Sequence, residues 1–112
     1  MKFKSLKTEP PKDGTWCLFR RKDGYVNTQP QAFFADEKKA HYVDYAVLPS
    51  HFVDNPEGWL SPYRGDPLPR KDSSCLVCTD NRKRMPFYAY FLAKEERFLG
   101  GCDADVIAYQ YI

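Results

Sequence analysis

The sequence predicts a mainly β fold built from two similar sets of short antiparallel strands. Phe, Trp and Tyr make up 16% of the 112 residues, and aromatic side chains favour the pleated, half-buried surface of a sheet. Short runs of β-branched and aromatic residues alternate with turn residues along both halves of the chain, as in β-hairpins. Five prolines between residues 49 and 70 exclude a long helix there. One or two short helices elsewhere would make the fold α+β.

The first half of the chain contains three expected strands, each bounded by turn residues. Asp13-Gly14 introduces the first strand, and a turn with Gly24 at a position that needs positive φ follows it. Pro49 ends the third strand, because proline cannot donate to a ladder. These strands are expected over residues 15–20, 31–35 and 41–48, with a turn or one helical turn over residues 36–40.

Residues 74–91 carry the clearest hairpin pattern of the second half. Two runs rich in β-branched and aromatic residues, 75–79 and 87–91, flank a polar and charged break. A closing strand is expected over residues 107–112. Residues 94–97, which precede Gly100-Gly101, are expected to form a short helix or a wide loop.

Three short matches indicate that the second half repeats the first. They occur in the same order, at offsets of 58, 57 and 64 positions. The sequence therefore predicts two three-stranded antiparallel meanders that pack together as a small sandwich or half-barrel, because neither buries its apolar face alone. The matched segments are Cys17-Leu18-Phe19 with Cys75-Leu76-Val77, Ala32-Phe33-Phe34 with Ala89-Tyr90-Phe91, and residues 43–48 with residues 107–112.

The chain is expected to form a single domain over residues 1–112, with repeat-like halves at residues 10–49 and 68–112. A Pro-rich connector over residues 50–67 joins them. This connector carries four large apolar residues, which indicates an ordered segment over the core rather than a flexible linker. These residues are Phe52, Trp59, Leu60 and Tyr63.

Charge and composition narrow the class of protein. The net charge of +2 is too small to indicate a polyanionic partner by itself. No run of about 18 apolar residues is present, so no transmembrane span and no membrane partner are expected. The N-terminal residues lack the apolar stretch of a secretory signal, which favours a cytoplasmic protein with its four cysteines reduced.

The two halves share a wider pattern. Each has a proline, then Asp-Gly or Asp-Ser, a Leu/Val-rich strand, an Ala-aromatic-aromatic strand and a closing strand with a central aromatic residue. In this the chain resembles two copies of the small phage- and prophage-borne domain-of-unknown-function family 551. The matching segments are Pro11-Lys12-Asp13-Gly14, Ala32-Phe33-Phe34 and residues 43–49 in the first copy, and residues 75–79, Ala89-Tyr90-Phe91 and residues 106–112 in the second.

The chain departs from the family in its closing strands. Tyr45 and Tyr109 stand where the family has tryptophan, and the family's closing Pro-Leu-Pro is reduced to Leu48-Pro49. The resemblance implies a small protein of a phage or other mobile element. It implies no reaction and supplies no catalytic residues.

The cysteines allow three interpretations: buried structural thiols, a zinc site, and a disulfide or redox role. A four-thiolate zinc site would use Cys17, Cys75, Cys78 and Cys102. However, two cysteines three positions apart on a strand point to opposite faces, and Leu76-Val77 between them supplies no turn. Cys17 and Cys75 also occupy matching places in the two halves. Buried structural thiols are therefore the favoured interpretation, and no metal or other cofactor is expected.

Basic residues cluster at the tips of the two expected hairpins, close to aromatic residues. Positive charge interleaved with aromatic rings is typical of sheets that hold single-stranded nucleic acid. Charged tips also keep hairpins soluble and protect edge strands. The tip residues are Arg20, Arg21 and Lys22 in the first half and Arg82, Lys83 and Arg84 in the second.

The connector supplies a further candidate surface, formed by Trp59, Tyr63 and Arg64, since Trp, Tyr and Arg carry much of the binding energy in protein interfaces. The alternative is that these side chains cover the core. No catalytic residues are assigned, and an enzyme is not expected. The sequence favours a non-catalytic accessory protein, monomeric or homodimeric, that occludes a partner protein. Single-stranded nucleic acid is the alternative partner.

Overall fold

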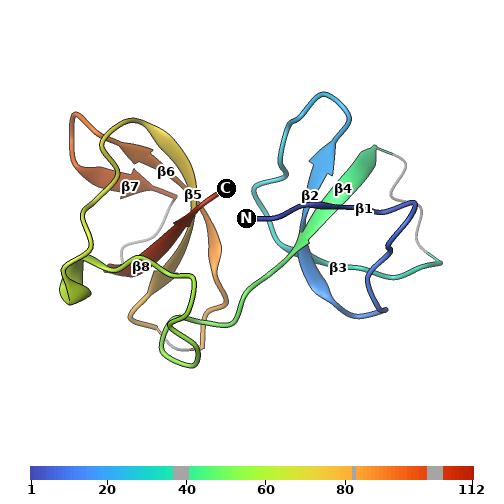
Figure 1. Cartoon of the computed structure of the whole chain (residues 1–112), viewed down its shortest axis with the longest axis horizontal. Coiled ribbons are helices and arrows are strands. Elements are labelled where there is room, and N and C mark those ends of the chain that lie inside the picture. The colour runs from blue at the N-terminus through green and yellow to red at the C-terminus, as the bar shows by residue number, and fades with distance from the viewer. Residues whose placement is uncertain (37–40, 82, 101–104) are drawn as a thin grey trace. The chain divides into compact units, whose positions relative to one another are not determined.

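The computed structural model describes residues 1–36, 41–81, 83–100 and 105–112. These residues form eight β-strands and one short 3-10 helix, so the predicted mainly β fold is confirmed. The chain divides into two compact units, Met1–Leu48 and Pro49–Ile112, and each contains one four-stranded antiparallel sheet (Figure 1).

Unit 1 is organised around its central strand β2. The strand order is β1-β4-β2-β3, with β2 paired to both β3 and β4. Side chains at alternate positions of β2 enter the core, as the two-residue period of a strand requires, and the core comprises Cys17, Phe19, Phe33 and Tyr45. The strands are β1 (Lys4–Ser5), β2 (Trp16–Arg21), β3 (Gln31–Ala32) and β4 (Tyr42–Val47).

Unit 2 is organised in the same way around β5, in the order β7-β6-β5-β8. The last five residues of β5 are all buried, so both faces of this strand are covered. The core on one face comprises Cys75, Val77, Ala89, Phe91 and Tyr109. The elements are the 3-10 helix η1 (Pro62–Arg64), β5 (Ser73–Thr79), β6 (Phe87–Leu92), β7 (Arg97–Leu99) and β8 (Val106–Tyr111).

Two features differ from the expected three-stranded meanders. In each unit the closing strand pairs with the first long strand, β4 with β2 and β8 with β5, so consecutive strands are not all neighbours as a meander requires. Each sheet also has a fourth, very short strand. Residues 94–97 form neither a helix nor a wide loop: residues 93–96 are the turn that leads into β7, and Arg97 is the first residue of that strand. The turn or helical turn expected over residues 36–40 falls partly outside the described residues.

The two sheets share one register. Both ladders also shift at the same place, between Arg20 and Arg21 in β2 and between Cys78 and Thr79 in β5. Matching residues of the two units differ by 58 in residue number in the first long strand and by 64 in the closing strand. These differences agree with the offsets found in the sequence. The matching pairs are Cys17 with Val47, Leu18 with Ala46 and Phe19 with Tyr45 in unit 1, and Cys75 with Tyr111, Leu76 with Gln110 and Val77 with Tyr109 in unit 2.

The repeat extends to side chains. The Tyr45 hydroxyl donates to the carbonyl of Glu9, and the Tyr109 hydroxyl donates to the carbonyl of Pro67, which stands 58 positions after Glu9. The predicted offset between the second strands of the two halves is wrong. Ala32 pairs with Trp16 as Tyr90 pairs with Ser74, so Ala32 corresponds to Tyr90 rather than to Ala89. The offset there is 58 rather than 57.

The Pro-rich connector belongs to unit 2 and is ordered. Trp59 is 2% exposed, and its indole N–H donates to the carbonyl of Ser50 at 3.0 Å. Leu60 forms an antiparallel bridge with Tyr109 on the outer edge of β8. This bridge corresponds to the pairing of β1 with β4 in unit 1. There Lys4 lies opposite Tyr45, the counterpart of Tyr109.

Candidate binding surface

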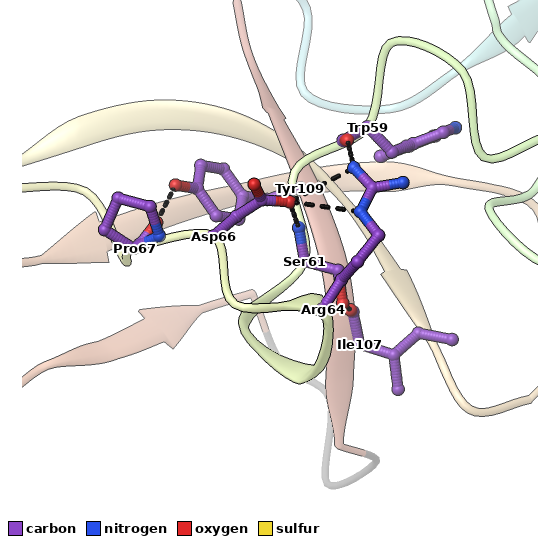
Figure 2. A network of polar contacts seen from close by, with 7 residues as sticks. All are labelled: Trp59, Ser61, Arg64, Asp66, Pro67, Ile107 and Tyr109. Atoms are coloured by element: carbon purple, nitrogen blue, oxygen red, sulfur yellow. Dashed lines mark hydrogen bonds and ion pairs between the residues drawn. The ribbon is translucent and has the colours of Figure 1, made fainter.

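The turn over residues 61–66 is held rigidly against β8 (Figure 2). Its η1 helix begins after Ser61 and ends at Gly65, whose φ of 94° favours glycine. The buried Ser61 hydroxyl donates to the carbonyl of Ile107 at 2.7 Å. The backbone N–H of Asp66 donates to the Ser61 carbonyl at 3.0 Å. The first bond ties the start of the turn to β8, and the hydroxyl of Tyr109 on β8 donates to the carbonyl of Pro67 at its other end, so the turn is fixed at both ends.

Arg64 and Asp66 form the polar centre of this turn. The Arg64 guanidinium donates to the Trp59 carbonyl at 2.6 Å and to Asp66 at 3.1 Å, and the Ser61 N–H donates to the same Asp66 oxygen at 2.9 Å. The hydrogen bond from Ser61 and then that from Arg64 lower the pKa of Asp66 below its ordinary value of 3.8.

Asp66 should make the stability of the fold sensitive to acid. Because its pKa is lowered on folding, its contribution is present above the unfolded pKa and is lost as pH falls through the folded pKa. We expect the urea midpoint of the wild type to fall more than that of Asp66→Asn between neutral pH and a pH below 3.8. Asp54→Asn, at an exposed carboxylate of the same unit, should retain the wild-type response. Equal acid sensitivity of the wild type and Asp66→Asn would contradict this assignment.

Tyr63 lies on this turn and is 76% exposed. Arg64 is partly exposed beside it, and its guanidinium lies 5.6 Å from the ring centre of Phe52. Trp59 does not join them at the surface, because its side chain is buried. Of the predicted connector patch, Trp59 therefore covers the core, and the structure leaves Tyr63 and Arg64 accessible.

The hairpin tip of unit 1 carries less free positive charge than its sequence suggests. Arg20 donates to Asp44 at 2.8 Å, and Arg21 pairs with Asp23. The hydrogen bond from Arg21 lowers the pKa of Asp23 to about 2, so this partner remains ionised. Lys22 is exposed at the same tip.

The hairpin tip of unit 2 presents its cations differently. The Arg84 guanidinium lies 3.9 Å from the ring centre of Phe87, a cation–π geometry. Lys83 is exposed next to it, and Arg82 lies outside the described residues.

The three described cysteines lie in strands. Cys17, Cys75 and Cys78 are free and buried, and burial raises the pKa of each thiol to about 11. Cys75 faces the core of unit 2, whereas the Cys78 sulfur accepts the N–H of Phe52 at 3.4 Å. Cys102, the fourth candidate zinc ligand, lies outside the described residues. Within the described part of the chain, no group of three or more His, Cys, Asp or Glu residues is placed to hold a metal.

His51 is buried and has a structural role. Its Nδ1 accepts the N–H of Val53 at 3.1 Å, so the proton is on Nε2, which donates to the Thr79 carbonyl at 2.9 Å. This side chain ties the connector to the end of β5, where the ladder shifts.

The polar network of the turn was missed by sequence reasoning. The sequence does not predict the roles of Ser61 and Asp66, because their hydrogen-bond partners are set by the folded turn and by β8. Ile107, which accepts from Ser61, is 46 positions away in the chain. The available signal was the run Ser61-Pro62 followed by Gly65-Asp66, a composition typical of turns.

Comparisons with family models, curated proteins and solved structures find no match for this chain. The only helix of the described residues has three residues, which is too short to cross a membrane.

Proposed function

We propose that this protein is a non-catalytic binding protein that occludes a surface of a partner protein through the turn carrying Tyr63 and Arg64. The single observation that carries the proposal is the 76% exposure of Tyr63 on a turn fixed by hydrogen bonds at both ends. A large exposed ring on a rigid support binds with little loss of conformational entropy. Tyr and Arg are also the residue types enriched at the energetic centres of interfaces.

A phage or other mobile element is the proposed source, and the cytoplasm of its bacterial host the proposed location. The resemblance to the phage-borne family 551 supports the first part. An accessory protein of this kind would act by covering a functional surface of a host or phage protein, without chemistry of its own and as a monomer or homodimer.

Protein is favoured over single-stranded nucleic acid as the partner because of the charges at the tips. Two of the three cations of the unit 1 tip are paired with Asp44 and Asp23, so that tip offers little net positive charge to a phosphate backbone. The Arg84–Phe87 stack and Lys83 at the other tip support the alternative.

Replacing Tyr63 should identify the binding surface. Immobilised protein is used to capture a partner from the host lysate, and affinity is then measured by calorimetry with the purified partner. We expect Tyr63→Ala to weaken binding by about 10-fold or more. Tyr25→Ala, at a tyrosine of unit 1 that is 55% exposed, is the matched control and should bind within about twofold of the wild type.

Two outcomes would contradict the proposal. Tyr63→Ala could bind the purified partner as tightly as the wild type. The captured material could instead be nucleic acid that is released by nuclease and by high salt, which would favour the basic tips.

A further inference from the structure

Unit 1 has an open groove beside its core. The groove has a volume of about 450 Å3, and its lining is mainly apolar. Val43, which is 40% exposed, forms part of this lining, and the exposed Lys7 lies at its edge. The lining residues are Ser5, Leu6, Lys7, Phe33, Tyr42, Val43 and Asp44.

In unit 2 an aromatic side chain packs against Phe91, the counterpart of the groove residue Phe33. Strand β7 pairs with β6 and brings Phe98 opposite Phe91. The Phe98 ring lies 4.8 Å from that of Phe91 and 5.7 Å from that of Tyr109, measured between ring centres. The shared register makes Phe33 and Tyr45 the counterparts of these two residues.

Unit 1 has no described strand at the place of β7. The N–H of Phe33 donates to the carbonyl of Thr15, and its carbonyl accepts from the N–H of Gly14, both in the segment before β2. Because main-chain groups of successive residues in a strand point in opposite directions, those of Ala32 and Phe34 point away from that segment. No strand of the described residues pairs with that outer edge of β3. Residues 35–41 read Ala-Asp-Glu-Lys-Lys-Ala-His, so the chain that follows this edge contains no aromatic residue that could replace Phe98.

We propose that the groove of unit 1 binds an extended segment of a partner protein, which pairs with the outward main-chain groups of Ala32 and Phe34 and inserts an aromatic side chain. Strand addition of this kind combines main-chain hydrogen bonds with a side-chain pocket. The same chain shows the arrangement intramolecularly, where Phe98 of β7 packs against β6 and β8.

The charges at the groove favour a segment with acidic residues. Asp44 is already paired with Arg20 at 2.8 Å, and no carboxylate of the described residues pairs with Lys7. The uncompensated charge at the groove is therefore positive. In the chain itself, the residues before Phe98 read Lys94-Glu95-Glu96-Arg97, and Glu95 pairs with Arg97 at 3.3 Å. The partner segment thus combines an aromatic residue with neighbouring carboxylates. This inference concerns unit 1 and does not depend on the Tyr63 turn.

A synthetic peptide with the sequence of residues 94–100, capped at both ends, is a direct probe of the groove. It is titrated to millimolar concentration into the full, isotope-labelled chain, and amide chemical shifts are followed. We expect saturable shifts at Ala32, Phe34 and Val43. A peptide with Phe98→Ala should bind at least about 10-fold more weakly, because the inserted ring is the anchor.

Two protein variants with matched controls complete the test. Val43→Glu should weaken binding, whereas Val47→Glu, at the other end of β4 and 53% exposed, should not. For a peptide with Lys94→Gln and Arg97→Gln, which leaves only its carboxylates charged, Lys7→Glu should weaken binding by about 2- to 10-fold at low salt, in contrast to Lys12→Glu. The proposal is overturned if the peptide does not bind, if Phe98→Ala makes no difference, or if the shifts centre on unit 2. It is also overturned if the groove is occupied by a second copy of the chain, seen as peptide-independent dimers abolished by Val43→Glu.

Discussion

Replacing Trp59 with alanine is expected to lower the free energy of unfolding of unit 2 by about 3–5 kcal/mol. Trp59 is 2% exposed, so its removal leaves a large cavity beside the sheet. The change also removes the indole hydrogen bond to the Ser50 carbonyl, although Ser50 is exposed and water can replace the donor. Urea unfolding followed by far-ultraviolet circular dichroism measures the loss.

Trp16 provides a matched control for this experiment. It is the other tryptophan of the chain, lies on β2 and is 45% exposed. Trp16→Ala should cost about 1 kcal/mol or less, because much of its ring is already in contact with water. Similar losses for the two variants would contradict the structural role assigned to Trp59 and would return it to the candidate binding surface.

Replacing Phe98 with alanine is expected to cost about 2–3 kcal/mol, less than a fully buried phenylalanine because its side chain is partly exposed. The change removes the ring contacts with Phe91 and Tyr109 and opens in unit 2 a groove like that of unit 1. Chemical denaturation measures the cost.

The neighbouring Leu99 is the control, because it lies on the same strand, points to the opposite face and is 38% exposed. Leu99→Ala should change the free energy of unfolding by about 1 kcal/mol or less. If Phe98→Ala lowered the free energy of unfolding by no more than Leu99→Ala, the result would contradict the comparison between the Phe98 ring of unit 2 and the open groove of unit 1.

The long strands were predictable because their signals are local. Alternating buried residues and flanking turn residues located β2, β4, β5, β6 and β8 within a few positions. Gly24 adopts the expected positive φ, 91°. The spacing of Cys17 and Cys75 and of Tyr45 and Tyr109 also predicted the register that the two sheets share.

The short strands were not predictable, since they exist only through their partners. Strand β1, the two residues Lys4–Ser5, forms because it pairs with the edge of β4 that β2 does not use. Strand β7 forms because it pairs with β6, where Phe98 lies opposite Phe91. Sequence reasoning placed Trp59, Tyr63 and Arg64 together as one candidate surface. The structure separated them, because Trp59 lies in the interior and Tyr63 on the turn.

By itself, the sequence determined the class of fold, the positions of the long strands and the repeat, since each depends on residues close together in the chain. The tertiary structure alone decided the order of strands, the fixed turn around Arg64 and Asp66, and the open groove of unit 1. These features depend on hydrogen bonds and packing between distant segments, such as the bond from Tyr109 to Pro67. The residues around either partner of such a contact contain no local sequence pattern from which the other partner could be predicted.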